Sequence, residues 1–431
     1  MPLKICIVAL NAYPAIDSRV PGGIGGVETR SWMFARGLAQ RDDCEVTFVV
    51  RHWQPLRDSE VQGVRLRMIR DRLYAVRESL ALRLQRTGRF PYVTLREPRL
   101  SDAFYLPLLA ARKLAIPTPD PLKPLRAFQD VDADVYLTFG VQNNAATVIS
   151  SAHSLDRPAL LFLGSDGDLD ERYLSDSKFV STYRDSAVVC RWAIENADQI
   201  LCQTPRQQER LSLFGRTAEV ISNPIDLDQW EQMLADVRRR QNRSTKERYV
   251  LWVGRAENVH KRPIDCIEVA KRCPDIPFLM ILNKRDDSVE AEIRRSAPSN
   301  VRIIEKVPFP EMPGVMERAA VLLNTSSLEG FPNTYLQAAA TGIPIASLNV
   351  ESQFLRESHA GECADGDLER LTTIVQHFWQ SPRTSADQQI ARQYVETHHS
   401  LRAKVDQLYH ALHEARFEKR RKEVPSTSDQ F

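Results

Sequence analysis

Paired cysteines and long apolar runs are both missing from this 431-residue sequence. Its seven cysteines are scattered, odd in number and contain no C-x-x-C pair. This pattern indicates thiols in a reducing compartment rather than a disulfide framework or a zinc site. No apolar run reaches the roughly 18 residues of a transmembrane helix, and the apolar start, which no small-residue cleavage site follows, predicts a buried strand. We therefore expect a cytoplasmic protein.

An excess of charge of either sign is also missing. With 58 Lys and Arg against 56 Asp and Glu, the formal net charge is +2, whereas a nucleic-acid binder usually carries a strongly basic domain or stripe. We expect no nucleic-acid partner. One local exception lies between residues 57 and 130, where 15 Lys and Arg face 8 Asp and Glu among apolar residues. Two interpretations stay open: helices packed on a sheet with solvated arginines, or a face for a membrane surface or an anionic acceptor.

Short apolar runs alternate with segments of helical periodicity along most of the chain. Helices are expected at 27–40 and 186–197, between the runs KICIVAL, CEVTFVV, ADVYLTF, PALLFL and DQILCQT. The pattern restarts at RYVLWVG, with further helices expected at 263–272 and 311–319. Continuous apolar strands that alternate with helices indicate parallel sheets covered on both faces. The fold class is therefore α/β, with two doubly wound domains and a ligand cleft where the carboxyl ends of their strands face each other.

Four glycines, Gly22, Gly23, Gly25 and Gly26, stand just before the helix expected at residue 27. Glycine allows close approach or positive φ, and a helix N-terminus offers unpaired N–H groups, so an anionic ligand is plausible here. A dinucleotide fingerprint is the rival. It is disfavoured because a third Gly or Ala is missing, the preceding loop is too long, and Arg51 replaces the usual acidic residue after the next strand.

Two cations, Arg255 and Lys261, frame a strand-to-helix crossover in LWVGRAENVHKRP. Arginine forms forked hydrogen bonds and lysine is a point charge, which together suit a diphosphate. Exposed, functionless cations are the alternative for this motif alone. In the stretch SSLEGFPNTYLQAAATGIP, Glu329 follows an apolar strand, and a helix is expected to begin near Asn333 and to end at Gly342. A carboxylate and loop N–H groups beside a helix N-terminus suit several hydroxyls, although an ordinary capped helix would look the same.

Taken in order, these stretches resemble the family 4 glycosyltransferases of the GT-B fold, retaining enzymes that use nucleotide-diphosphate sugars. The likeness spans nearly the whole chain and includes the G-G-x-G-G loop, ENADQILCQTPRQQERL, VISNPIDLDQW, WVGRAENVHKRP and EGFPNTYLQAAATGIPI. It implies an acceptor-binding Rossmann-like domain at 1–224 and a donor domain at 225–399. A helix at 400–418 would cross back onto the first domain, and the charged, Ser- and Pro-containing tail at 419–431 is expected to be disordered.

The resemblance also implies site residues. Arg255 and Lys261 would hold the donor diphosphate, which the four loop glycines would line. The donor sugar would be held by Glu329 and by the backbone of Gly330, Phe331, Pro332 and Asn333, and the base would lie near Val307.

Two positions depart from the family pattern. Gln337 stands where a second glutamate usually binds the ribose, and its amide can still accept and donate hydrogen bonds, although more weakly than a charged group. The histidine often found after the fourth strand is absent, and Asp166 is a candidate replacement at the reacting centre or on the acceptor side.

No metal and no other cofactor are expected, because Arg255 and Lys261 already offset the phosphate charge; the D-x-D at Asp166 belongs to a different architecture when it binds metal. His398 and His399 lack ligand spacing and are expected to be solvated. The expected partners are a nucleotide-sugar donor and a saccharide or lipid-linked acceptor from surface polysaccharide or glycolipid assembly, with peripheral contact at the inner membrane face left open.

Retaining glycosidases need two carboxylates about 5 Å apart, and the motif supplies only Glu329. We therefore hypothesise that the leaving group drives the reaction, with the two cations stabilising the departing diphosphate. Two alternatives remain: a catalytically silent nucleotide-sugar-binding protein of the same fold, and a GT-B nucleotide-sugar epimerase.

Overall fold

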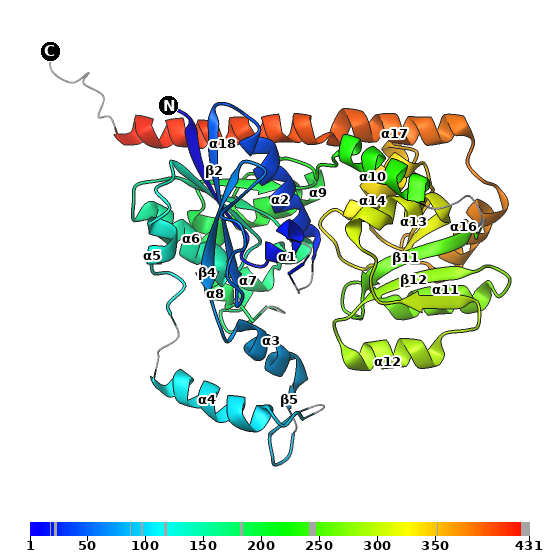
Figure 1. The fold of residues 1–431 in the computed structure, drawn as a ribbon, viewed down its shortest axis with the longest axis horizontal. Coiled ribbons are helices and arrows are strands. Elements are labelled where there is room, and N and C mark those ends of the chain that lie inside the picture. Colours follow the sequence, from blue (N-terminus) through cyan, green and yellow to red (C-terminus); the bar gives the residue numbers. More distant parts are fainter. Residues whose placement is uncertain are drawn as a thin grey trace.

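Two parallel sheets, one in each half of the chain, form the framework of the protein (Figure 1). The computed structural model describes residues 1–17, 19–20, 24–86, 88–95, 98–115, 119–181, 184–240, 247–350 and 352–423. The first sheet has the strand order β10-β9-β8-β7-β1-β2-β4-β3 and the second the order β13-β12-β11-β14-β15-β16. All pairings in these two sheets are parallel except that of β3 with β4. This confirms the expected α/β class with two Rossmann-like domains.

The elements of the first domain are, in order, β1 (Leu3–Val8), α1 (Tyr13–Ile16), α2 (Gly26–Ala39), β2 (Cys44–His52), β3 (Glu60–Val61), β4 (Val64–Arg70), α3 (Tyr74–Arg83), β5 (Leu84–Arg86), β6 (Val93–Leu95), α4 (Asp102–Ala115), α5 (Arg126–Gln129), β7 (Val135–Phe139), α6 (Asn143–His153), β8 (Ala159–Phe162), η1 (Asp166–Leu169), α7 (Arg172–Ser175), α8 (Ala187–Asn196), β9 (Gln199–Cys202), α9 (Pro205–Leu211), η2 (Ser212–Phe214) and β10 (Glu219–Val220). The expected helices at 27–40 and 186–197 are confirmed to within one residue at each end.

The second domain and the final helices follow as α10 (Leu227–Arg240), β11 (Tyr249–Arg255), α11 (Pro263–Arg272), β12 (Phe278–Asn283), α12 (Asp287–Ser296), β13 (Val301–Ile304), η3 (Phe309–Glu311), α13 (Met312–Arg318), β14 (Ala319–Asn324), α14 (Asn333–Thr341), β15 (Ile345–Ser347), α15 (Ser352–Glu357), β16 (Gly361–Cys363), α16 (Leu368–Gln380), α17 (Ser385–His399) and α18 (Leu401–Glu423). The helix at 263–272 has the expected bounds. The last helix continues to Glu423, past the expected end at 418, and the rest of the expected tail lies outside the described residues.

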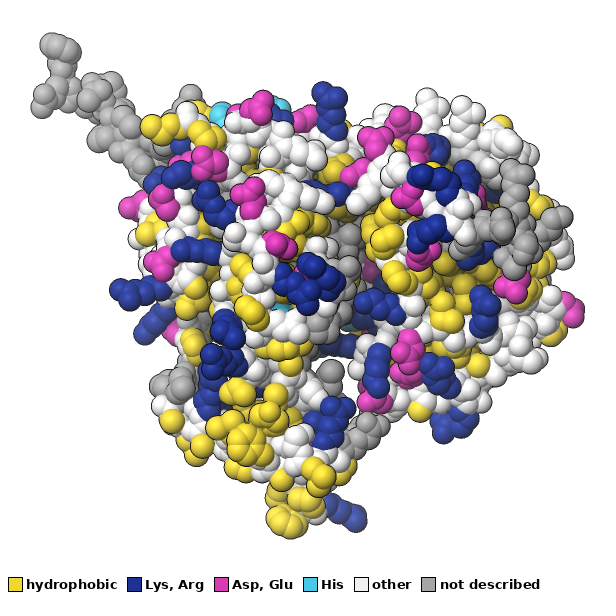
Figure 2. Space-filling view, in the orientation of Figure 1, with side chains coloured by type: hydrophobic (Ala, Val, Ile, Leu, Met, Phe, Trp, Pro, Cys, Tyr) yellow, Lys and Arg dark blue, Asp and Glu magenta, His cyan; other side chains and the backbone are white. Residues whose placement is uncertain are grey.

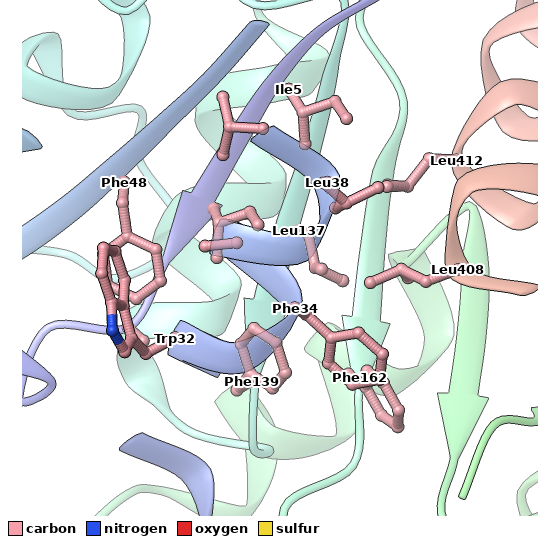
Figure 3. Close-up of a cluster of buried hydrophobic side chains, with 14 of the residues drawn as sticks. Ile5, Trp32, Phe34, Leu38, Phe48, Leu137, Phe139, Phe162, Leu408 and Leu412 are labelled. Atoms are coloured by element: carbon pink, nitrogen blue, oxygen red, sulfur yellow. The ribbon is translucent and has the colours of Figure 1, made fainter. Parts of the chain in front are cut away.

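Each central strand is buried on both faces, because its alternate residues serve two different cores. In β1, Ile5 and Ile7 pack with α2 and α18, whereas Cys6 and Val8 pack with α6 and α8 on the other face. Figure 3 shows α2 side chains between the sheet and Leu408 and Leu412 of α18. This double burial explains why these strands are continuous apolar runs rather than alternating ones.

The chain crosses between the domains twice, and the two crossings are hydrogen-bonded to each other. Ile225 N–H donates to the His399 carbonyl at 2.8 Å, and Leu401 N–H donates to the Ile225 carbonyl at 3.0 Å. At the second crossing α17, which packs on α14, gives way to α18, which packs on α2 (Figure 1). The last helix therefore returns to the first domain.

His399 corrects one expectation. Its ring is 4% exposed, lies 5.2 Å from the ring of Phe331, and its Nδ1 is 2.9 Å from the Asn223 carbonyl oxygen. A buried imidazole is disfavoured in its charged form, and burial lowers the pKa of His399 to about 4. The expectation of a solvated side chain was wrong, because the two crossings enclose this end of α17.

Among the described residues, no helix is both long enough and apolar enough to cross a bilayer.

Candidate active site

The loop after β11 is held in place by side chains that form hydrogen bonds with its backbone N–H and carbonyl groups. Glu257 accepts the N–H groups of Val259, His260 and Lys261 at 2.9 to 3.0 Å. Thr325, just after the neighbouring strand β14, donates its hydroxyl to the carbonyls of Lys261 and Arg262 at 3.0 and 2.9 Å. The loop is thereby tied to the next strand end, and Lys261 is placed immediately before α11.

Lys261 and Glu329 form an ion pair between the two loops. Ser326 donates its hydroxyl to Glu329 Oε1 at 2.8 Å, the same oxygen that pairs with Lys261. The two side chains keep 24% and 16% of their surface exposed. The pair therefore remains reachable from solvent. An anionic ligand could accept some of the hydrogen bonds that the Lys261 ammonium now donates to the carboxylate.

Arg255 and the glycine loop meet across the two domains. A Cβ at Gly25 would lie 2.9 Å from Arg255 Nη2 and 2.6 Å from Glu28 Oε2. Gly25 has an extended backbone, with φ −118°, so glycine is needed here for close approach rather than for positive φ. Gly25 is the N-cap of α2, so the Arg255 guanidinium lies directly against this helix N-terminus, where the Gly25 N–H donates to Glu28 Oε2 at 2.9 Å. Gly22 and Gly23 lie outside the described residues.

The loop 330–333 is held against the first domain through Asn223. Asn223 Nδ2 donates to the Phe331 carbonyl at 3.0 Å and to Asn333 Oδ1 at 2.7 Å. The Phe331 ring packs on Phe354 in the core of the second domain, 5.2 Å between centroids, and Pro332, the N-cap of α14, is also buried. A Cβ at Gly330 would collide with the Gln203 side chain of the first domain.

Arg30 continues this network into the first domain. Its guanidinium donates to Asn223 Oδ1 at 2.9 Å and to the Leu163 carbonyl at 2.7 Å, and it lies 4.3 Å from the Phe162 ring centroid. The side chain is 1% exposed, and this burial lowers the pKa of Arg30 to about 9. A hydrogen-bonded path thus runs from the end of β8 through Arg30 and Asn223 to the loop that carries Glu329.

Asp166 faces the same cleft from the first domain. It is 7% exposed and accepts a hydrogen bond from Gln207 at 3.1 Å. Burial raises the pKa of Asp166, and the negative charge of Glu329 across the cleft adds to the increase. Asp168 points elsewhere: it accepts the Gly164 N–H at 2.6 Å, and burial raises its pKa to about 6. Among the described residues, no group of three or more His, Cys, Asp or Glu side chains could hold a metal ion.

Gln337 lies one turn beyond Asn333 on α14, and Val307 lies between β13 and η3. Gln337 lines a pocket at the domain junction with Thr29 of α2, Asp226 and Phe309 among others. Val307 is half-buried and packs against the core of the second domain.

The structure therefore brings Gly25 to Arg255, Gly26 to Asn333, and Lys261 to Glu329, and it places Asp166 near enough to Glu329 for their charges to interact. Sequence reasoning missed Arg30, Asn223, Gln203 and Glu257. Arg30 had a usable signal, because it stands one turn before Phe34 on the apolar face of α2. The other three are recognisable only from contacts between loops that are distant in sequence.

One family model matches part of the second domain. Residues 247–380 match the family model described as glycosyl transferases group 1. A comparison with curated proteins found no match. The matched segment covers most of the second domain, which holds Arg255, Lys261 and Glu329.

Solved structures resemble the whole chain. Sucrose-phosphate synthase from Thermosynechococcus elongatus matches with a TM-score of 0.68 at 15% identity, over 96% of this chain and 100% of that one. Anabaena HepE, solved with UDP and glucose, matches with a TM-score of 0.62 at 13% identity, over 95% and 99%. The trehalose-6-phosphate synthase OtsA matches with a TM-score of 0.62 at 10% identity, over 95% and 99%. The fold is GT-B, and together with the family match it supports a glycosyltransferase.

Proposed function

We propose that the protein is a retaining glycosyltransferase of family 4 type, which transfers a sugar from a nucleotide-diphosphate sugar to a hydroxyl of an acceptor. The observation that carries this proposal is the placement of Arg255 and Lys261 at the carboxyl end of β11, with the N-terminus of α2 in contact with Arg255 and Glu329 beside Lys261. Two cations near the end of one strand, with a helix N-terminus against one of them, suit a diphosphate, and the carboxylate beside the other suits sugar hydroxyls.

In the proposed donor complex the diphosphate lies between Arg255 and Lys261. It accepts some of the hydrogen bonds that the Lys261 ammonium donates to Glu329 in the free protein. Glu329 then accepts hydrogen bonds from hydroxyls of the donor sugar, beside the backbone of residues 330–333. The base is placed near Val307, and Gln337 accepts or donates a hydrogen bond at the ribose. The absence of a Cβ at Gly25 lets the ligand approach the α2 backbone closely.

The chemistry follows from the positions of the charges. As the bond between the anomeric carbon and the phosphate oxygen breaks, negative charge grows on the diphosphate, where fixed cations stabilise it without reorganisation. The acceptor hydroxyl attacks the anomeric carbon from the face that the phosphate leaves, and its proton passes to a phosphate oxygen. Asp166, across the cleft from Glu329, is placed on the acceptor side of the reacting centre.

The acceptor is proposed to be a saccharide or a lipid-linked saccharide in surface polysaccharide or glycolipid assembly, in the cytoplasm. The proposed reaction uses no metal or other cofactor.

A thermal-shift panel of UDP, GDP, ADP and their sugar conjugates tests donor binding first. A bound ligand stabilises the folded state by RT ln(1 + [L]/Kd), so one nucleotide should raise the melting temperature, and Gln337→Glu should enlarge the shift by adding a charged hydrogen-bond acceptor. No shift with any nucleotide would contradict the proposal.

Release of nucleoside diphosphate in the presence of candidate acceptors tests transfer. Arg255→Ala and Lys261→Ala should each slow turnover about 100-fold or more without loss of folding. The matched control is Lys271→Ala, which removes an exposed cation at the far end of α11. The anomeric configuration of the product, read by proton NMR, tests retention. A donor shift with no transfer to any acceptor would favour the catalytically silent alternative.

A further inference from the structure

A part of the first domain projects away from its sheet. It leaves from the end of β4 through α3 and contains the β5–β6 hairpin and α4, which lie below the first sheet in Figure 1. Residues 88–95 and 98–115 are called the projecting tip here. Arg83, at the end of α3, pairs with Asp102 of α4 through contacts of 2.5 and 2.7 Å, and both side chains are buried. This pair holds α4 in place.

The projecting tip exposes apolar side chains. Asp102 is the single buried residue of α4; Tyr105, Leu106 and Leu109 are half-buried, and the rest of the helix is exposed. Leu100, Phe104 and Leu108 recur every fourth residue and are 100%, 67% and 40% exposed. Phe90 and Tyr92 in the hairpin are 87% and 68% exposed. Figure 2 shows the resulting apolar patch at the foot of the molecule, bordered by Lys and Arg side chains.

The charges of the projecting tip are of one sign. Its exposed charged residues are Arg89, Arg99, Arg112 and Lys113, and its single acidic residue, Asp102, is buried against Arg83. Exposed aromatic and aliphatic groups surrounded by cations match a bilayer surface in which acyl chains lie beneath anionic headgroups.

We infer that the projecting tip docks the protein onto a membrane surface that carries anionic lipids. The apolar side chains enter the boundary between headgroups and acyl chains, and the cations contact the headgroups. A second copy of this chain is the competing occupant, but two tips of the same positive charge repel each other. Docking places α4 on the surface and leaves the rest of the protein outside the bilayer. The inference concerns binding and does not depend on the transfer reaction.

The position of the projecting tip relative to the cleft supports this orientation. β1, β2 and β4 are parallel, so the segment after β4 leaves from the same edge of the sheet as the loop that ends at Gly25. Tyr74 of α3 donates its hydroxyl to Asn11, just after β1, at 3.0 Å, and Arg51 lies 4.5 Å from the Tyr74 ring centroid. A docked tip therefore turns the mouth of the cleft toward the membrane surface.

Co-flotation of the full-length protein with vesicles tests the inference. The vesicles are pure phosphatidylcholine, or phosphatidylcholine with about one-third phosphatidylglycerol. The protein should float with the anionic vesicles, should be released by salt that screens the charges, and should not float with pure phosphatidylcholine. Absence of flotation with anionic vesicles at low salt would overturn the inference.

Two double variants separate the apolar and electrostatic contributions. Leu100→Ser with Phe104→Ser should weaken binding about 100-fold, because two apolar side chains no longer leave water. Arg112→Gln with Lys113→Gln should weaken it about 25-fold, at roughly fivefold for each cation. All four side chains are exposed, so circular dichroism and thermal unfolding should match the parent protein.

The control is Lys271→Gln with Arg272→Gln, which removes the same charge from exposed positions on α11 of the second domain. It should float as well as the parent protein. If the control lost as much vesicle binding as the Arg112 and Lys113 variant, the effect would come from the net charge of the protein. That result would overturn the assignment to the projecting tip. A concentration-dependent dimer in sedimentation, abolished by the Leu100 and Phe104 variant, would assign the patch to a second copy instead.

Discussion

Asn223 is the residue whose removal tests the domain junction most directly. Its side chain is 2% exposed. It accepts from Arg30 at 2.9 Å and donates to the Phe331 carbonyl and to Asn333 at 3.0 and 2.7 Å. Asn223→Ala removes all three hydrogen bonds and leaves one N–H of a buried guanidinium unpaired. A hydrogen bond to a charged group contributes about 1.5–3 kcal/mol and a neutral one about 1 kcal/mol.

We therefore expect Asn223→Ala to lower the free energy of unfolding by about 3 kcal/mol. This value is below the sum of the three hydrogen bonds because water that enters the site can bond to some of the groups left unpaired. Urea unfolding followed by tryptophan fluorescence and circular dichroism measures the change, and coincidence of the two signals checks that one transition is observed. A loss below about 0.5 kcal/mol, the range of ordinary surface substitutions, would refute the importance of this junction.

Asn223→Asp separates the two sides of the junction. A carboxylate still accepts from Arg30, but it cannot donate to the Phe331 carbonyl, which it repels, and it repels Asn333 Oδ1 in the present orientation of that amide. We expect Arg30 to stay paired while the loop 330–333 loses its tie to the first domain. Small-angle scattering should then show a larger radius of gyration than in the parent protein. An unchanged radius together with parent-like donor binding would show that these two hydrogen bonds do not hold the domains together.

Three further predictions follow from close contacts and one pKa. Gly37→Ala should destabilise the protein by about 1–3 kcal/mol, because the new methyl group collides with Val405 of α18; Val405→Ala in the same chain should restore most of the loss in urea unfolding. Burial lowers the pKa of His399 from its ordinary 6.5 to about 4. Between these pH values only the unfolded chain binds the proton, so the free energy of unfolding is at its full value above about pH 6.5 and falls by about 3 kcal/mol as the pH drops toward 4. His399→Asn, which keeps a donor to the Asn223 carbonyl, should flatten this part of the profile, and an equally steep profile would exclude the histidine. Gly330→Ala should displace Gln203 and open the domains in small-angle scattering, with rescue by Gln203→Ala.

Much of the candidate site could be predicted from sequence because its residues follow strand ends. Arg255 ends β11, Lys261 precedes α11, and Glu329 lies between β14 and α14. Parallel strands bring their carboxyl ends to one edge of a sheet, so the alternation of apolar runs and helices was sufficient to place these three residues together. The contact of Gly25 with Arg255 joins two domains, and no local pattern specifies it.

In the region 57–130 the sequence pattern did not show whether the helices pack on the sheet or form a free surface. Its composition was compatible with helices packed on the sheet and with a free cationic surface. The structure leaves all of α4 except Asp102 unburied, which excludes the packed interpretation for this helix. Amphipathic periodicity says which residues share a face but not what that face meets, since burial depends on the neighbouring elements.

The sequence by itself determined the α/β class, the two sheets, most helix bounds and the placement of Arg255, Lys261 and Glu329 at strand ends, because these depend on periodicity and on local turn chemistry. Tertiary structure alone decided that Arg30 is buried against Asn223, that His399 is enclosed by the two domain crossings, and that the tip around α4 is exposed. Each of these features depends on contacts between segments far apart in the chain. Their free energies arise from burial and hydrogen bonding, which exist only once both partners are in place.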